Sequence, residues 1–480
     1  MKTIPPIPAL VLAAAAATAS LLGGAPSTQA APLQAGAAAV DITPRDFPLQ
    51  IRGSFNPPPV SEVHDPLFVR AIVLADGDTT VAIAVVDSCM VAREELDRAK
   101  AIAEKASGIP AARQMIGSTH THSAPFSNAQ HQTPQEIAYQ KQLIDGIAAA
   151  IVQAHANLQP ASVGWGGRDL PDEVFNRRWF LKEGTMPANP FGETDELVKM
   201  NPGALNPDLV HPAAGTDPEV SILSVRDAKR KPLALLANYS LHYVGGIGGS
   251  VISADYFGEF ARIMPTRLGA PESFVALLSN GTSGDINNIS FSKPRPPRQP
   301  FEQIRLVATK VADTAWFAER DIPEYLGDVK LGMVEREVAL KMRVPTGEQI
   351  SRSEEILKMA GEDEKKLPRL AKSYAERILK LAREGETMPI KLQALRIGDL
   401  VIASVPFETF VEIGLELKAR SPFADTFTIE LANGAGGYLP TPRQHALGGY
   451  ETWLSTNKVQ KDSSEIIVAN LLEMFGELKK

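Results

Sequence analysis

Residues 118–125, Ser-Thr-His-Thr-His-Ser-Ala-Pro, place two histidines one residue apart within a cluster of hydroxyl side chains. His120 and His122 follow an apolar segment, and they are two of only eight histidines in the chain. At the end of an extended strand, residues i and i+2 point to the same side. Neutral imidazole is the commonest protein ligand for metals such as zinc. The pair therefore indicates a metal site. The alternative is that both histidines have only a structural role.

Other polar residues share this position directly after an apolar run. The full set is His120, His122, His242, Asp285, Glu408 and Tyr438. In an α/β layer, strand ends at one edge of a sheet meet in space, so we expect these side chains to converge. Two or three imidazoles and a carboxylate would form a catalytic zinc site with a position left for water. Each residue also has an ordinary explanation: His242 as a core histidine, Glu408 as a carboxylate at a helix N-terminus, and Tyr438 as a packing residue.

The segments around the histidine pair read as strand, helix and strand. Apolar runs at 69–75 and 81–86 flank Asp-Gly-Asp at 76–78, which is typical of a hairpin. Residues 91–106 predict an amphipathic helix, closed by a glycine and a proline. Residues 115–117 then lead into the histidines. The predicted chemistry thus lies at the C-terminal end of a strand, where sites of α/β proteins usually lie.

The rest of the chain continues this alternation. We expect helices at 134–157 and over the last 20 residues, and strands at 233–241, at 274–278, and twice within 392–405. Residues 165–218 are rich in Pro, Gly and Asn with little periodicity, which indicates a long loop that is functional or a lid. The charged residues 350–386 predict a solvated helical hairpin or insertion. No internal repeat or linker stands out, so residues 31–480 are predicted to form a single domain.

Composition and the N-terminus indicate an exported globular protein. The chain has 480 residues, of which 44% are hydrophobic, and a net charge of −7. It contains no long run of basic residues, so nucleic acid is not expected as a partner. Residues 1–30 resemble a secretory signal peptide with cleavage near Ala30, and a buried N-terminal helix is the alternative. No later stretch predicts a transmembrane span. The sequence therefore predicts a secreted or periplasmic protein. Cys89 is the only cysteine and is expected to be a buried small hydrophobe rather than a nucleophile.

The histidine segment also resembles a known family. Residues 117–125, Gly-Ser-Thr-His-Thr-His-Ser-Ala-Pro, look like the Ala-Thr-His-Thr-His-Ser-Gly-Pro signature of neutral ceramidases. Enzymes of that family are zinc amidases that cleave ceramide into sphingosine and fatty acid. Further similar segments follow in the family's order, at residues 38–44, 176–177, 284–285, 406–408, 437–441 and 449–451. The resemblance spans about residues 36 to 455.

This resemblance implies a role for each matching residue. The implied zinc ligands are His120, His242, Glu408 and Tyr438. The implied catalytic residues around a zinc-bound water and the substrate carbonyl are His122, Arg177 and Tyr450. Zinc and the carboxylate would prepare the hydroxide, and the arginine or the second tyrosine would stabilise the oxyanion. His122 would deliver a proton to the leaving amine.

The sequence departs from the family at three places. The family's serine in Gly-Asp-Val-Ser-Pro-Asn falls on Asn287, so any role of that serine is lost. The charged segment 350–386 has no counterpart, and no room is expected for the family's C-terminal immunoglobulin-like domain. We therefore expect an α/β fold with a large mixed β-sheet core and flanking helices, like the catalytic domain of a neutral ceramidase.

The predicted function is that of a zinc-dependent amidohydrolase that cleaves an amide bond through a zinc-bound hydroxide. Ceramide, N-acyl-sphingosine, is the expected substrate, and a small-molecule or lipid substrate is the only partner predicted. The alternatives are a zinc hydrolase of another amide, ester or glycoconjugate, and a non-catalytic binding protein on the same fold. A phosphate-transfer enzyme is not expected, because no glycine-rich phosphate-binding motif with a lysine is present. The oligomeric state stays open.

Overall fold

The computed structural model describes residues 1, 3, 32–53 and 59–480. The predicted signal peptide, residues 1–30, lies almost entirely outside the described residues and stays a prediction. Within the described part of the chain, no helix has both the length and the apolar character that crossing a bilayer requires.

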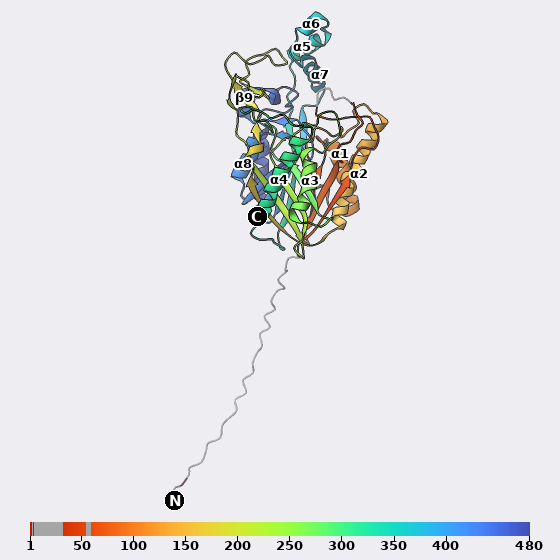
Figure 1. Ribbon diagram of the computed structural model, residues 1–480, viewed down its shortest axis with the longest axis vertical. Helices are drawn as coiled ribbons and strands as arrows, with labels where there is room; N and C mark the ends of the chain where they lie inside the picture. The colour runs from red at the N-terminus through yellow and green to blue at the C-terminus, as the bar shows by residue number, and fades with distance from the viewer. Residues whose placement is uncertain (2, 4–31, 54–58) are drawn as a thin grey trace.

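Two β-sheets form the centre of the molecule, with helices outside them (Figure 1). The larger sheet has the order β14 (Val275–Asn280), β13 (Pro232–Tyr239), β12 (Glu219–Asp227), β7 (Gln159–Asp169), β1 (Gln34–Asp41), β4 (Phe68–Ala75), β5 (Thr80–Val86), β6 (Gln114–Ser118). The smaller sheet has the order β16 (Leu331–Lys341), β17 (Thr387–Ile397), β18 (Leu400–Val405), β20 (Asp425–Glu430). Both sheets contain parallel and antiparallel pairs. The predicted α/β fold with a large mixed β-sheet core and flanking helices is confirmed, and the core consists of two sheets.

Alternation along the strands explains why the sheets face each other. In β5, residues 81, 83 and 85 belong to a buried cluster that also contains Leu400 and Ile402 of β18. Residues 82, 84 and 86 point the other way and pack under helices. Because successive side chains of a strand point to opposite faces, a strand that is apolar on both faces must be covered twice. Here a second sheet covers one face and helices cover the other.

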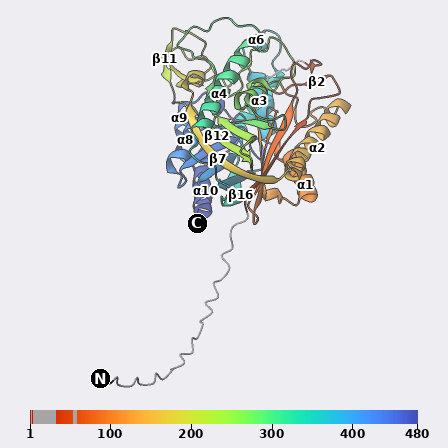
Figure 2. The ribbon, with the colours of Figure 1, turned by 60° about the horizontal axis from the view of Figure 1, so that its bottom comes forward.

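Three pairs of helices cover the outer faces. They are α1 (Arg93–Ser107) with α2 (Pro134–Ala156), α3 (Asp255–Leu268) with α4 (Glu302–Arg320), and α8 (Val411–Arg420) with α10 (Ser463–Lys479). The first pair lies on one side of the molecule and the last on the opposite side (Figure 2). Helix α2 begins at a capping box between Thr133 and Glu136, and α1 ends at Gly108 with φ of 78°. The predicted helices at 91–106 and 134–157 are confirmed to within two residues.

Three parallel strand pairs position the site. Strands β5 and β6, β13 and β14, and β18 and β20 each run parallel, with α1, α3 and α8 as the respective connections. A parallel pair needs such a crossover, and it brings the carboxyl ends of both strands to the same edge. The predicted polar residues follow these ends.

Residues 165–218 contain more regular structure than predicted. Strand β7 continues to Asp169, and β9 (Arg178–Leu181) pairs with β10 (Val198–Met200) and β11 (Leu209–Pro212). The prediction of one long irregular loop was therefore wrong for these parts. Strands of three or four residues interrupted by Pro and Gly are too short to show a period of two.

The segment 350–386 is helical, as predicted, with α5 (Gly347–Lys358), α6 (Glu362–Lys365) and α7 (Ala371–Leu381). These helices rise at the top of the molecule in Figure 1. They are not wholly solvated, however, because Tyr374 is only 1% exposed, and Ile378 packs with Leu454. The inner face of the insertion is thus part of the folded body.

Candidate metal centre

His120, His242 and Glu408 meet in the interior, although each follows a different strand end. Nε2 of His120 lies 2.9 Å from Nε2 of His242 and 3.4 Å from Oε2 of Glu408. Nε2 of His242 lies 3.7 Å from the same carboxylate oxygen. Ligands bonded to zinc at about 2.0–2.1 Å in a tetrahedron are separated from each other by roughly 3.3 Å. The three separations bracket that value, so these atoms have the spacing of a tetrahedral metal site.

Backbone carbonyls fix the tautomers of both histidines. Nδ1 of His120 lies 2.7 Å from the carbonyl oxygen of Cys89, and Nδ1 of His242 lies 3.0 Å from that of Ser283. A carbonyl oxygen only accepts, so each Nδ1 carries a proton and each Nε2 is the atom left to bind a metal ion. Burial lowers the pKa of His120, but Cys89 and Glu408 outweigh it and raise this pKa well above its usual value, so without a metal ion a proton on Nε2 of His120 faces Nε2 of His242 at 2.9 Å. A metal cation can take the place of that proton. The arrangement therefore fits a bound metal ion.

The backbone of His120 is held in an uncommon conformation. Its φ is 70°, in the left-handed region that residues with a side chain rarely adopt. Its N–H donates to the carbonyl of Ser88, which fixes the turn after β6. Strained conformations of this kind persist where the surrounding structure enforces them, and they cluster at functional sites.

Tyr438 reaches the same place by strand pairing. Strand β19 (Glu408–Thr409) runs parallel to β21 (Tyr438–Leu439), and the register sets Tyr438 directly beside Glu408. The phenol donates a hydrogen bond to the Glu408 carboxylate. Burial alone would raise the pKa of Glu408, but His120 and this hydrogen bond lower it, so the group is a carboxylate. Burial raises the pKa of Tyr438 well above its usual value, next to that negative charge.

His122 adjoins the group without joining the three central ligands. Its Nε2 lies 3.2 Å from Nε2 of His120, and its ring stacks on Tyr243 with centroids 3.7 Å apart. Burial, then the neighbouring charges of His120 and Arg177, depress the pKa of His122 well below the usual value. The same causes depress the pKa of His242. Both imidazoles are therefore neutral near pH 7.

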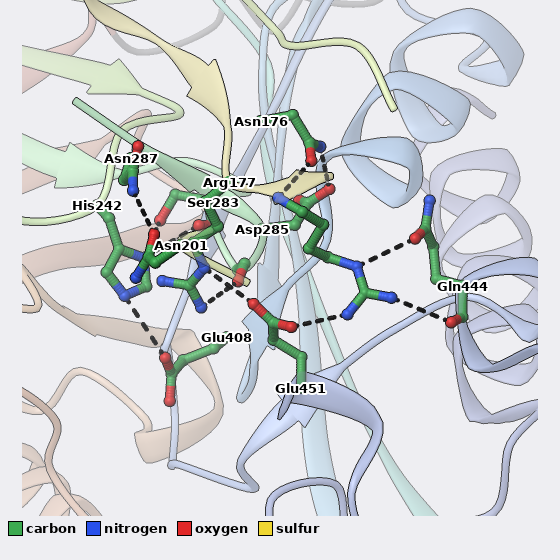
Figure 3. Close-up of polar contacts among 12 residues, drawn as sticks. Asn176, Arg177, Asn201, His242, Ser283, Asp285, Asn287, Glu408, Gln444 and Glu451 are labelled. Carbon is green, nitrogen blue, oxygen red and sulfur yellow. Dashed lines mark hydrogen bonds and ion pairs between the residues drawn. The ribbon is translucent and has the colours of Figure 1, made fainter. Parts of the chain in front are cut away.

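Arg177 is fixed by a buried carboxylate. Its Nε donates to Oε1 of Glu451 at 2.9 Å, and a terminal nitrogen donates to the carbonyl of Gly284 at 2.8 Å. The other oxygen of Glu451 accepts from Arg178 at 2.7 Å, so the carboxylate lies between two guanidinium groups (Figure 3). Glu451 and Arg178 are both fully buried. The Arg177 guanidinium also lies over the Tyr438 ring, 5.4 Å from its centroid.

Tyr450 borders the site on the side of Tyr438. The two rings meet edge to face with centroids 5.6 Å apart, and Trp453 lies the same distance from Tyr450 on its other side. Burial raises the pKa of the Tyr450 phenol, so it keeps its proton and is a donor near neutral pH.

Sequence comparisons match the chain to a known protein family. Residues 34–291 match the sequence model of the N-terminal part of neutral/alkaline non-lysosomal ceramidases. The chain belongs to this family. It is 25% identical over 271 residues to neutral ceramidase B of Dictyostelium discoideum, a match that covers 53% of this chain and 35% of that relative. It is also 25% identical over 198 residues to the neutral ceramidase of Pseudomonas aeruginosa, covering 39% of this chain and 26% of that protein. The matched segments thus span about a third or less of these curated relatives.

Solved structures extend the likeness over nearly the whole chain. The crystal structure of the neutral ceramidase from Pseudomonas aeruginosa superposes with a TM-score of 0.70 at 17% identity, covering 93% of this chain and 74% of that one. A ceramidase complexed with C2 gives a TM-score of 0.71 at 18% identity, covering 94% and 75%. At these identities the likeness establishes a shared fold.

Two residues predicted near the site of this ceramidase-family chain serve the scaffold. The carboxylate of Asp285 accepts from Asn176 at 2.7 Å and from the backbone N–H of Val411 at 2.9 Å, so it is not a member of the metal group. Asn287, at the position of the family's serine, donates to the side chain of Asn201 at 2.8 Å. Cys89 is buried, as predicted, and its thiol lies 3.7 Å from Nδ1 of His120.

Sequence reasoning missed Glu430, a buried carboxylate beneath the ligands. Its Oε1 accepts from Asn280 at 2.9 Å and from the Ser283 hydroxyl at 2.7 Å. Its Oε2 accepts from the backbone N–H groups of Ser283 at 3.2 Å and Thr409 at 2.7 Å. Ser283 holds His242, and Thr409 follows Glu408, so Glu430 supports two of the three residues that could hold a metal ion. It ends strand β20, and the strand-end rule that found the ligands would also have found it.

Proposed function

We propose that this protein is a zinc-dependent amidohydrolase that cleaves ceramide into fatty acid and sphingosine. The observation that carries the proposal is the buried group of two histidine Nε2 atoms and a carboxylate oxygen with tetrahedral spacing. Membership of the neutral/alkaline ceramidase family supports the choice of an amide of a sphingoid base as substrate. The proposed location is outside the cytoplasm, on the strength of the signal-like residues 1–30.

The residues proposed to hold the metal are His120, His242, Glu408 and Tyr438. Neutral imidazole and carboxylate are ligands that zinc commonly accepts. Tyr438 holds its proton without the metal and would lose it on binding zinc through the phenol oxygen. A zinc ion bound there would act as a Lewis acid on the amide carbonyl and would lower the pKa of a water molecule.

The surrounding side chains would supply the rest of the chemistry. Glu451 holds the Arg177 guanidinium, so that its charge is preorganised for the oxygen of the amide as negative charge develops there. Tyr450, protonated near neutral pH, would donate a hydrogen bond to the same oxygen. His122 is neutral and stacked on Tyr243, which suits it to accept a proton and to pass one to the leaving amine.

The test combines product analysis with one ligand variant. Purified protein is incubated with ceramide, with and without a chelator, and free fatty acid and sphingosine are followed by mass spectrometry. We expect release of both products, loss of release with chelator, and a higher melting temperature with zinc than without it.

In this assay His242→Ala should fold but lose both stoichiometric zinc and turnover, because it removes one of three buried ligand atoms. His155→Ala, at the C-terminal end of α2, serves as the control and should keep both. Full turnover by His242→Ala would show that the metal assignment is wrong. Zinc binding without product release would keep the metal and reject ceramide in favour of another amide, an ester or a glycoconjugate. Neither zinc nor turnover in the wild type would favour a binding protein.

A further inference from the structure

A cavity lies outside the metal centre, between the insertion and the body of the protein. It has a volume of about 780 Å³ and is bordered by α5 and α7, by residues 189–196, and by residues 445–461. Its wall includes the rings of Phe191, Tyr374 and Trp453 and the side chain of Ile378. The same Trp453 ring contacts Tyr450, so the cavity adjoins the metal centre without belonging to it.

Arg343 brings an incompletely used guanidinium to this cavity. One terminal nitrogen donates to the carbonyl of Thr452 at 2.8 Å and to the side chain of Asn457 at 3.0 Å. Its other N–H groups have no protein acceptor among the described residues. No carboxylate offsets its burial, which by itself lowers the pKa of Arg343. Arg343 is half-buried, and a cation held partly away from water without a counter-ion is stabilised when an anion is supplied.

His445 lines the same cavity and is only 8% exposed. Its Nε2 is buried and makes no hydrogen bond to any described residue. Burial, then the positive charges of Arg343 and Lys461, lower the pKa of His445 to about 3. The imidazole is therefore neutral, and it can present an N–H donor to a ligand. A buried polar atom without a partner is rare in a native structure and calls for an unseen partner.

The charges around the cavity are not evenly spread. Lys461 lines it and forms no ion pair with any described residue. Three wall carboxylates are already engaged: Glu193 by Asn189, Glu196 by the indole N–H of Trp453, and Glu355 by Arg352. A fourth, Glu348, lies in the first turn of α5, where the helix dipole favours it. Hydrogen bonds do not remove these negative charges, but none of the four carboxylates forms an ion pair with Arg343 or Lys461 among the described residues, so both cations lack a counter-ion.

We propose that this cavity binds an amphiphile whose head group is an oxyanion, a phosphate or a carboxylate. Arg343, His445 and Lys461 would donate hydrogen bonds to the head group. The aromatic and aliphatic wall would cover the apolar chain. The site is separate from the metal centre, and the proposal does not depend on the proposed reaction.

Calorimetric titration tests the proposal on the His242→Ala protein, in which oxyanions cannot be captured by a complete metal site. The probes are octyl phosphate, octanoate, inorganic phosphate and the uncharged octyl glucoside, all below their micelle concentrations. We expect octyl phosphate or octanoate to bind with one-to-one stoichiometry, at least about tenfold more tightly than octyl glucoside. Equal binding of octyl glucoside would overturn the oxyanion assignment. Equal binding of inorganic phosphate would overturn the amphiphile and leave a free anion as ligand.

Two variants locate the site. Lys461→Gln removes a positive charge and His445→Leu removes the imidazole N–H donor, so each should weaken binding of the anionic probe by about tenfold. Lys479→Gln, at the end of α10, is the control and should bind like the parent protein. Arg343 is not substituted, since it also holds residues 452 and 457. Unchanged affinity in both folded variants would place the anion elsewhere and refute the proposal.

Discussion

Replacement of Glu430 tests whether the hydrogen bonds that hold the proposed metal ligands in place contribute to stability and zinc affinity, while the ligands themselves stay unchanged. Glu430→Ala removes the acceptor of four hydrogen bonds and leaves buried donors on Asn280, Ser283 and Thr409. The Ser283 hydroxyl can rotate to another acceptor, but the two backbone N–H groups and the Asn280 amide cannot. Each buried donor without a partner costs about 1–3 kcal/mol. The variant should therefore lose about 3 kcal/mol or more of unfolding free energy.

Glu430→Gln should be much milder, because the local structure can accommodate an amide. The oxygen of the new amide can take the place of Oε2, where two backbone N–H groups need an acceptor. Its NH₂ group then faces Asn280 and the Ser283 hydroxyl. Oδ1 of Asn280 is buried without a partner among the described residues, so a flip of the Asn280 amide would provide an acceptor. We expect Glu430→Gln to keep zinc, and Glu430→Ala to bind it at least about tenfold more weakly.

The pH dependence of stability gives a second readout. Burial raises the pKa of Glu430 to about 8, above the value of 4.5 in an unfolded chain. The neutral Glu430 carboxyl group therefore stabilises the fold fully below about pH 4.5. Between about pH 4.5 and about pH 8 this contribution is lost, and the free energy of unfolding falls by about 1.4 kcal/mol per pH unit. Glu430→Gln stays neutral throughout. Its stability relative to the wild type should accordingly rise from pH 5 to pH 8.5.

Denaturant unfolding of the chelated proteins, together with zinc titration against a competing chelator, measures all three effects. Glu95→Ala is the matched control: Glu95 is also buried, but it lies on α1 and accepts from Gln140. The control should lose stability without losing zinc affinity. Two results would refute the reasoning: wild-type zinc affinity in Glu430→Ala, or parallel pH–stability curves for the wild type and Glu430→Gln.

Two further substitutions test the geometry of the site. A Cβ added at Gly284 would lie 2.5 Å from the carbonyl oxygen of Glu408, so Gly284→Ala should displace this proposed ligand and lower zinc affinity. Gly166 has open space around it, so Gly166→Ala should leave zinc affinity unchanged. Equal zinc affinities of the two variants would show that Glu408 is not held in a fixed position. Glu451→Gln leaves two buried guanidinium groups without a carboxylate and should lower the unfolding free energy by about 3–5 kcal/mol, as measured by denaturant titration. The exposed Glu473→Gln should change it by no more than about 1 kcal/mol, and a similarly small effect at Glu451 would mean that the arginines find other partners.

The ligands could be predicted from the sequence because one physical rule covers them. His120, His242 and Glu408 follow buried strands of parallel pairs, and the carboxyl ends of such strands meet at one edge. The rule needs only strand periodicity and order, which are local. The predicted joint position of these three residues is therefore confirmed by the structure, while their role as zinc ligands stays a proposal.

Other features depend on tertiary arrangement and leave no local signal. Glu451 pairs with Arg177 and Arg178 across more than 270 positions of sequence, and nothing near any of them specifies the partner. The division into two sheets was missed for a related reason. A strand that is apolar on both faces must be covered on both, but the pattern does not say whether a helix or another sheet provides the cover.

The position of the metal centre gives it a structural consequence. His120 and His242 follow strands of the larger sheet, while Glu408 and Tyr438 continue from the smaller one. A metal ion held by all four would link the two sheets at one end of the core that they share. Glu430 spans the same junction, since Asn280 ends a strand of the larger sheet and Thr409 follows the smaller one. A bound metal ion and Glu430 would therefore stabilise the same junction, so their effects on unfolding should not be additive, and the destabilisation by Glu430→Ala should differ between zinc-loaded and chelated protein.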